Sequence, residues 1–259
     1  MFEDKEVRKK PSIRTLVRFR SDQLKGYNPD DRERLNIERK YSHLIREDLE
    51  LGNLVSYIGN REVPLLRLYR YKEAFAFKFV RHFINRFGLT SKDYVFDPFA
   101  GMGTTLFTSY LFGIPSIGID KLPIATFIAS TIPRLLFLEN GKLRDTYEML
   151  KQRVGRADPA PVAMDVRIMK LAFDQDVLMR LRRWKAVIDE LGPSLRDIFL
   201  LLFFSILEDT SYASKDGQFL RLKKEKNPMD PDEALLKKVR EAEQDLERIR
   251  WFFPSWNGS

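Results

Sequence analysis

The sequence predicts an α/β protein in which a few parallel strands are flanked by helices and are followed by a largely helical C-terminal region. Two short apolar runs predict the strands, and each ends in an aspartate: residues 94–97 (Tyr-Val-Phe-Asp) and residues 116–120 (Ser-Ile-Gly-Ile-Asp). A glycine turn and a helix-like stretch from Leu106 to Phe112 separate the two runs. A strand, a helix and a second strand in this order are typical of a parallel βαβ unit.

Residues 1–62 form a polar and basic N-terminal segment. A helical pattern runs from residue 29 or 30 to Leu51, and turns are expected at residues 26–29 and 59–60.

Residues 63–139 contain the predicted βαβ unit, preceded by a helix and followed by another after Pro123. The residues that recur at helical spacing in the first helix are Phe75, Phe79, Phe83 and Phe87, with Val80 and Ile84. We therefore expect most of this phenylalanine stripe to be core, with only its first turn, at Phe75, near a ligand.

Residues 140–259 form a mainly helical region. Helical patterns cover residues 143–154, 177–191, 195–207 and 232–251, and the proline-containing stretches 158–161 and 192–193 interrupt them.

The segment at residues 208–224 is rich in hydroxyl, amide, aromatic and cationic side chains. Such side chains contact phosphates and base edges, so we expect a nucleic-acid-contacting loop here. The alternative is an exposed turn at residues 215–217. The residues expected to make the contacts are Tyr212, Ser214, Lys215 and Arg221.

The turn at residues 97–105 (Asp-Pro-Phe-Ala-Gly-Met-Gly-Thr-Thr) has the composition of a ligand-binding turn. Gly101 and Gly103 lack a Cβ, so they permit a tight turn and let backbone N–H groups approach a ligand. Thr104 or Thr105 is expected to cap the next helix, whose N-terminus favours a carboxylate or a phosphate.

Two aspartates complete the expected site. Asp97, at the end of its strand, suits a cationic group, and Asp120, nineteen residues after Gly101, suits the two hydroxyls of a ribose. A phosphate-binding P-loop would need Gly-Lys-Ser/Thr, and a dinucleotide fingerprint would need a third glycine at Leu106. The residues therefore favour a ligand with an amino acid end and a ribose.

The turn, together with residues 113–120 (Gly-Ile-Pro-Ser-Ile-Gly-Ile-Asp), resembles the cofactor motif of S-adenosylmethionine-dependent DNA amino-methyltransferases. Residues 71–77 are similar to the segment that touches the cofactor in these enzymes, although Phe77 stands where a proline is common. The resemblance covers residues 64–130. It implies a partial Rossmann-like methyltransferase core, S-adenosyl-L-methionine as cofactor, DNA as partner, and methylation of an exocyclic amine, N4 of cytosine or N6 of adenine.

By this resemblance, residues of the turn hold the methionine end of the cofactor and Asp120 holds its ribose. The implied cofactor-binding residues are Phe75, Asp97, Phe99, Ala100, Gly101, Gly103, Thr104, Thr105 and Asp120. The segment at residues 208–224 also resembles a loop found in a subset of these methyltransferases.

The catalytic motif of this family, a polar residue followed by Pro-Pro and an aromatic residue, is absent from the sequence. No Pro-Pro pair occurs, and the nearest segments are residues 227–230 and 253–256. The two predicted strands are also too few for a parallel core. We therefore expect an incomplete or split enzyme, inactive alone, whose catalytic motif lies beyond Ser259 or on a second polypeptide.

Two alternative functions stay open. One is a non-catalytic module that binds S-adenosylmethionine or regulates a methyltransferase. The other is an RNA methyltransferase, because some of these enzymes carry a similar Asp-Pro-Phe-x-Gly-x-Gly turn. The catalytic residues, the target base and the recognition sequence are not predicted.

The net charge of +8 and the isoelectric point near 9.5 suit a polyanionic partner. Two basic clusters are expected either to contact phosphates or to form solvated faces. They comprise Lys5, Arg8, Lys9, Lys10, Arg14, Arg18, Arg20 and Lys25, and, later in the chain, Arg221, Lys223, Lys224 and Lys226.

The composition excludes some classes of site. The sequence has no cysteine, which rules out disulfides and thiolate metal sites, and His43 and His82 lie too far apart in sequence to suggest a metal site. No signal peptide opens the chain, and apolar runs such as residues 198–207 are too short to cross a bilayer. We therefore expect a cytoplasmic protein without membrane contact.

Overall fold

The computed structural model describes residues 32–44, 48–162, 167–216, 219–223 and 225–252. The chain divides into two compact units between Leu49 and Glu50. The basic cluster at residues 5–25, the turn predicted at residues 26–29, Lys224 and the segment at residues 253–256 lie outside the described residues. The domain boundaries expected near residues 62 and 139 stay predictions.

In the first unit, the described residues form helix α1 (Arg32–Tyr41) and the 3-10 helix η2 (Ser42–Leu44). The prediction of one helix reaching Leu51 is wrong, because the α-helix ends at Tyr41 and a separate 3-10 helix, η3 (Leu49–Asn53), covers the later residues. The described side chains of α1 are exposed, so no packed face extends this helix.

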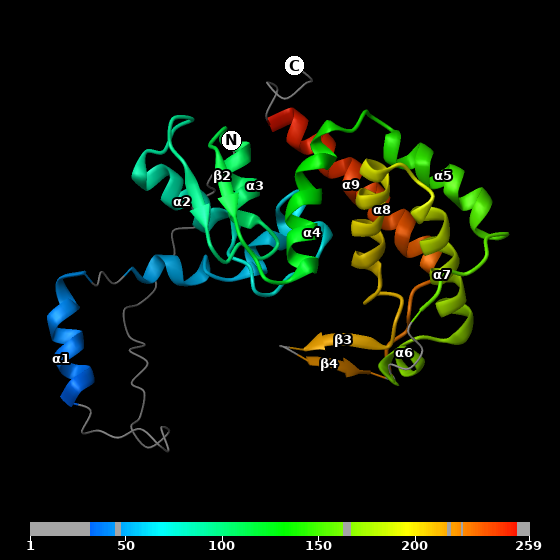
Figure 1. The fold of residues 1–259 in the computed structure, drawn as a ribbon, viewed down its shortest axis with the longest axis horizontal. Coiled ribbons are helices and arrows are strands. Elements are labelled where there is room, and N and C mark those ends of the chain that lie inside the picture. Colours follow the sequence, from blue (N-terminus) through cyan, green and yellow to red (C-terminus); the bar gives the residue numbers. More distant parts are fainter. Residues whose placement is uncertain (1–31, 45–47, 163–166, 217–218, 224, 253–259) are drawn as a thin grey trace, which may run out of the picture. The chain divides into compact units, whose positions relative to one another are not determined.

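The predicted βαβ unit is confirmed in the second unit. Strands β1 (Val95–Asp97) and β2 (Ser116–Gly118) are parallel, and helix α3 (Thr104–Leu111) connects them. Helix α3 packs against both strands and against helix α2 (Phe77–Phe87), and helix α4 (Pro123–Thr131) follows β2 (Figure 1). The fold is thus a mixture of helices and strands with a small parallel sheet.

Helices make up most of the remaining described chain. The 3-10 helices are η4 (Tyr57–Glu62), η5 (Leu66–Leu68) and η6 (Ile132–Phe137), and the α-helices are α5 (Lys142–Val154), α6 (Arg167–Ala172), α7 (Gln175–Asp189), α8 (Pro193–Ile206) and α9 (Pro231–Phe252). The four helices predicted after residue 140 are confirmed as α5, α7, α8 and α9. Helix α6 was not predicted. None of the described helices combines the length and apolar character needed to cross a membrane.

Two turn or loop predictions are wrong. Residues 59–60 lie inside the 3-10 helix η4 rather than in a turn. In the segment at residues 208–224, strands β3 (Ala213–Asp216) and β4 (Phe219–Leu222) form an antiparallel pair that follows α8 (Figure 1). Cross-strand pairing joins residues 213–216 to residues 219–222, although their polar composition indicates a loop.

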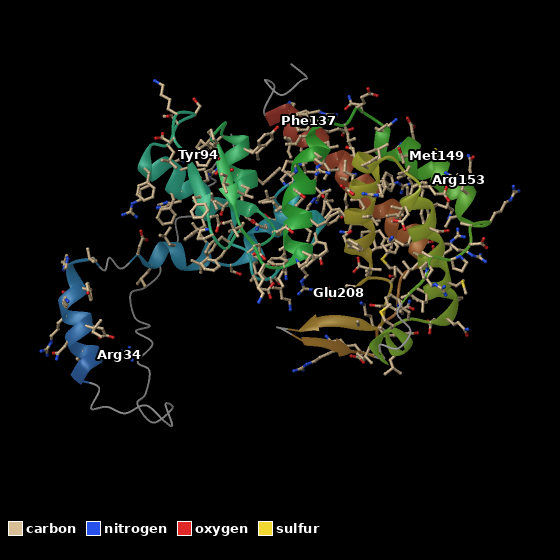
Figure 2. The ribbon with its side chains drawn as sticks, viewed as in Figure 1. Arg34, Tyr94, Phe137, Met149, Arg153 and Glu208 are labelled. Atoms are coloured by element: carbon tan, nitrogen blue, oxygen red, sulfur yellow. The ribbon has the colours of Figure 1, made fainter. Side chains whose placement is uncertain are left out.

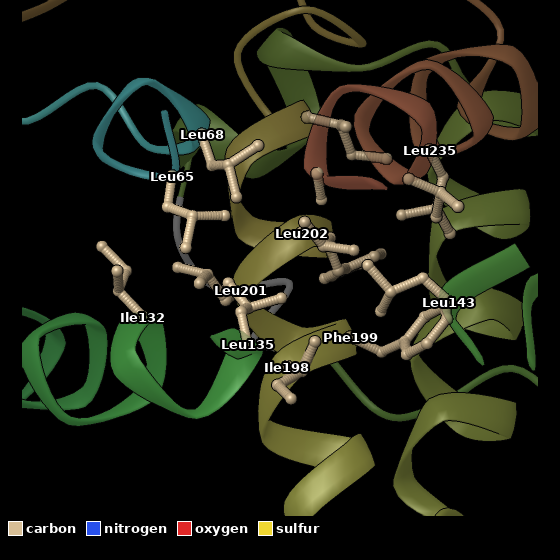
Figure 3. Packing of buried hydrophobic residues seen from close by; sticks show 14 of the residues in the cluster. Leu65, Leu68, Ile132, Leu135, Leu143, Ile198, Phe199, Leu201, Leu202 and Leu235 are labelled. Atoms are coloured by element: carbon tan, nitrogen blue, oxygen red, sulfur yellow. The ribbon is translucent and has the colours of Figure 1, made fainter. Parts of the chain in front are cut away.

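The core of the second unit is centred on α8. Its residues Ile198, Phe199, Leu201 and Leu202 are fully buried, and apolar residues of η5, η6, α5 and α9 surround them (Figure 3). A helix that is apolar on most sides is typically buried in this way.

The buried Asp245 joins α9 to the segment that leads into the βαβ unit. Its carboxylate accepts a 2.8 Å hydrogen bond from the N–H of Leu65 and lies 2.7 Å from the Arg67 guanidinium. A buried carboxylate is tolerated only when it is paired and hydrogen-bonded in this manner. These contacts hold residues 65–67 on the helical region.

Asp232 fixes the first turn of α9 on α7. It accepts hydrogen bonds from Arg180 at 2.7 and 2.8 Å and from Trp184 Nε1 at 2.6 Å, and Lys151 also bonds to it. Burial by itself would raise its pKa, but the hydrogen bonds from Arg180, Lys151 and Trp184 lower the pKa of Asp232 to about 2.

We expect Gly103 to tolerate no side chain. Its φ is +84°, and a Cβ added there would lie 2.7 Å from the Cβ of Ala129 in α4. Gly103→Ala is therefore expected to lower the free energy of unfolding by about 3 kcal/mol, from backbone strain and steric overlap together. Urea denaturation of the 259-residue chain measures this change.

Gly113→Ala is the matched control. Gly113 also has a positive φ, +69°, but a Cβ there would meet nothing within 4 Å. Strain alone predicts a cost of about 1 kcal/mol. Equal costs for the two variants would contradict the close packing of α4 on the turn.

Candidate functional site

The candidate site is the glycine turn at the carboxyl end of β1. The Asp97 side chain accepts a 3.0 Å hydrogen bond from the N–H of Phe99, using one of its two oxygens. The N–H of Ala100 donates to the carbonyl of Ile119 at 2.9 Å, and the N–H of Ile119 donates to the carbonyl of Asp97 at 2.9 Å. These hydrogen bonds hold the turn against the end of β2. The Phe99 side chain, in the turn, is 85% exposed.

Asp120 is brought to the turn, as the spacing predicted. One of its carboxylate oxygens accepts a 2.9 Å hydrogen bond from the N–H of Gly101, and the other accepts a 2.8 Å bond from the N–H of Leu122. Each oxygen retains a second lone pair for a ligand hydroxyl. The structure thus gives Asp120 a role in shaping the turn, while its contact with a ribose stays a prediction.

The predicted threonine cap of α3 is wrong. The N-cap is Gly103, which makes no side-chain capping bond, and Thr104 and Thr105 are the first two residues of the helix. Thr104 is buried, and its hydroxyl accepts a 3.3 Å hydrogen bond from the side chain of Asn60. No side chain therefore bonds to the first N–H groups of α3, the kind of groups that bind anions at helix N-termini.

Asn60 is a residue of the site that the sequence did not reveal. Its side chain is buried, donates a 2.8 Å hydrogen bond to the carbonyl of Phe75 and accepts a 2.8 Å bond from the N–H of Phe77. With its bond to Thr104, it joins η4, the start of α2 and the N-terminus of α3. A polar residue next to Gly59 indicated only a turn, so no local signal marked it.

The prediction that the phenylalanine stripe of α2 is mostly core is confirmed for Val80 and Ile84 and wrong for Phe79, Phe83 and Phe87, which are not buried. Phe75 and Phe87 are 46% and 66% exposed, and the rings of Phe75 and Phe79 stack with centroids 4.9 Å apart. The buried residues of α2 are Phe77, Val80 and Ile84. Val80 and Ile84 cluster with Ile114, and Leu89 and Val95 pack against this cluster. Phe75 thus presents a ring at the surface near the start of α2.

The β3–β4 pair brings together two of the predicted nucleic-acid contacts. Ser214 and Arg221 are direct partners in its register, and Arg221 is exposed. The Tyr212 hydroxyl donates a 2.9 Å hydrogen bond to the carboxylate of Asp174, which anchors the pair to the start of α7. Lys215 lies on β3, opposite Leu220. Contacts of these residues with nucleic acid stay predictions.

One face of the β1–β2 sheet is apolar and open. Phe96 and Ile117 are register partners, and they are 59% and 49% exposed, with Ile119 beyond the strand 57% exposed. The opposite face is closed by α3, since a Cβ on Gly118 would lie 2.8 Å from the Leu106 side chain. Within the described residues, neither strand pairs with a third.

Ligands of α/β proteins bind where parallel strands end and a glycine turn leads into a helix, and the turn of this chain lies at that place. The fold thus defines an α/β protein whose glycine turn lies between the carboxyl end of β1 and the N-terminus of α3. Sequence comparison supplies the family: the chain is a relative of the Type II methyltransferases. This confirms the expected relationship to DNA methyltransferases.

Two relatives illustrate the extent of this similarity. The chain is 33% identical over 196 residues to the Type II methyltransferase M.BsoBI of Geobacillus stearothermophilus, which covers 73% of the chain and 38% of that protein. It is 31% identical over 189 residues to the Type II methyltransferase M.AvaI of Nostoc sp., covering 71% of the chain and 39% of that protein. The chain therefore spans less than half the length of these relatives. No family model and no solved structure matches it.

We expect Asn60→Ala to destabilise the chain. The substitution removes three hydrogen bonds and leaves the carbonyl of Phe75 and the buried N–H of Phe77 without this partner. The free energy of unfolding should fall by about 3 kcal/mol, as measured by urea denaturation. Asn85→Ala, at an exposed position of α2, is the control and should change stability by less than about 0.5 kcal/mol. A similarly small effect at Asn60 would show that its bonds do not hold the turn.

Proposed function

We propose that the chain forms the S-adenosylmethionine-binding part of a DNA methyltransferase that methylates an exocyclic base amine, N4 of cytosine or N6 of adenine. The observation that carries this proposal is the uncapped N-terminus of α3 behind the glycine turn, with Asp120 hydrogen-bonded to Gly101 beside it. The relationship to Type II methyltransferases supports it.

The residues of the turn fit this cofactor. The first N–H groups of α3 suit its carboxylate, and the second oxygen of Asp97 suits its ammonium group. The free lone pairs of Asp120 suit the ribose hydroxyls, and the exposed ring of Phe75 offers an apolar contact. S-adenosylmethionine, when bound, supplies an electrophilic methyl group. The chain's contribution is to hold it in a fixed orientation, which is the main source of rate in such a transfer.

We also propose that catalysis needs further polypeptide, either a second chain or a longer form of this one. Strands of parallel sheets are normally buried on both faces, whereas Phe96 and Ile117 are exposed on an apolar face. Unpaired strand edges likewise favour the addition of more strands. The added part would cover this face and carry the Pro-Pro-aromatic motif that the sequence lacks.

We expect Asp120→Ala to weaken binding of S-adenosylmethionine by about 1 to 3 kcal/mol, because charged hydrogen bonds to the ribose are lost. Isothermal titration calorimetry on the 259-residue chain measures this change. Asp93→Ala is the matched control, since Asp93 also accepts a backbone hydrogen bond, from Thr90 at 2.7 Å, but precedes β1 and should leave affinity unchanged. Equal affinity in both variants, or no binding by the unaltered chain, would contradict the proposed site.

We expect methyl transfer to DNA only when the chain is combined with a polypeptide carrying the Pro-Pro-aromatic motif. Phe96→Asp should abolish this reconstituted activity while leaving S-adenosylmethionine binding intact, because the side chain is already exposed. Met149→Asp, at an exposed position of α5 labelled in Figure 2, should preserve activity. Radiolabelled methyl transfer measures both. Full activity of the chain alone, or of the Phe96→Asp combination, would count against the proposal.

A further inference from the structure

A cleft of about 290 Å³ lies beside the glycine turn. Its lining includes Met102 of the turn, residues of η4 and η5 and, from α9, Lys238 and Glu241. Four of its charged lining residues are cationic and one is anionic: Arg61, Arg67, Arg70 and Lys238 against Glu241. The cleft therefore presents an excess of positive charge next to the proposed cofactor site.

Two of these arginines converge on one phenol oxygen. Arg61 donates a 3.1 Å hydrogen bond to the Tyr57 hydroxyl, and Arg70 donates one at 3.5 Å. The Arg61 guanidinium also lies over the Tyr57 ring, 5.5 Å from its centroid. The hydrogen bonds from Arg70 and Arg61 lower the pKa of Tyr57, as expected where positive charge is concentrated.

The charge of the other two cations is already neutralised. Arg67 is paired with the buried Asp245 at 2.7 Å, and Lys238 is paired with Glu241 at 2.7 Å. These two side chains form the wall of the cleft.

Arg61 and Arg70 are less fully paired. Arg70 lies 3.4 Å from Glu208, which is labelled in Figure 2, and its side chain is 43% exposed. Arg61 is exposed, and no carboxylate of the described residues lies within ion-pair distance of it. Both guanidinium groups are thus accessible from solvent and able to bind an anion.

We propose that Tyr57, Arg61 and Arg70 bind a phosphodiester group of the DNA strand at the mouth of this cleft. The inference rests on the proposed function and adds a DNA contact to it. Two neighbouring guanidinium groups match the geometry of a phosphate. Their position at the surface suits a polymer better than a small cofactor. The phenol orients both arginines before the phosphate arrives.

A second cavity adjoins the cleft and extends the surface that a DNA strand could follow. Tyr69 and Arg70 also line a second, mainly apolar cavity of about 320 Å³ that reaches Ser211 and Ala213 at the start of the β3–β4 pair. The two cavities therefore share a border at Arg70. A strand bound there runs from the glycine turn toward Ser214 and Arg221, and Arg70 lies between the two proposed sites.

The test is the salt dependence of DNA binding by the 259-residue chain. Binding is monitored through the fluorescence anisotropy of a short labelled duplex. Loss of one phosphate contact should reduce the slope of log K against log salt concentration by about 0.9 in Arg61→Gln/Arg70→Gln. Affinity for S-adenosylmethionine should stay unchanged. Tyr57→Phe, which keeps the ring but removes the hydroxyl, should reduce the slope by less.

The matched control is Arg144→Gln/Arg153→Gln in α5, which removes the same charge from two exposed arginines that are each paired with a glutamate. Its slope should equal that of the unaltered chain. Equal slopes for the two double variants, or no DNA binding by the unaltered chain, would overturn the inference while leaving cofactor binding as an independent result. A fall in cofactor affinity without a change in slope would assign the cleft to the cofactor carboxylate instead, and tighter binding of RNA than of DNA would assign it to a different polymer.

Discussion

The hydrogen bonds of Asn60 are the interaction on which the candidate site depends. One buried amide joins η4, the start of α2 and the N-terminus of α3, which are separated by up to 44 residues in sequence. A buried amide whose donor and acceptor are both satisfied fixes the orientation of its partners. The same amide bonds to Thr104, which together with Thr105 lies inside α3, after its N-cap Gly103. Asp120 then fixes the turn from the other side through Gly101.

The small parallel sheet has two unequal faces. Helix α3 closes one face, while Phe96 and Ile117 leave the other face apolar and open. In the proposed function, the glycine turn at the end of these strands positions the methyl donor, and further polypeptide holds the acceptor base. The relationship to Type II methyltransferases supports this proposal.

Local patterns predicted most of the regular elements well, but they predicted the burial of α2 and the strands β3 and β4 poorly. The βαβ unit and the helices α5, α7, α8 and α9 follow from strand and helix periodicity and from proline and glycine breaks. Periodicity identified Val80 and Ile84 as buried in α2, but it did not separate them from the neighbouring phenylalanines, because both sets are apolar. It also missed the β3–β4 pair, since polar residues such as Ser214 and Lys215 have low strand preference and are ordered by cross-strand bonds.

The sequence by itself determined the glycine turn, the two aspartates at the strand ends and the kinship with methyltransferases, because these depend on residue types at short spacing. Only the tertiary structure decided that Asn60 reaches Thr104, that Asp245 holds Leu65, and that Arg61 and Arg70 converge on Tyr57. The first two contacts join residues 44 and 180 positions apart. Their proximity follows from the packing of elements that are distant in sequence, which no local pattern specifies.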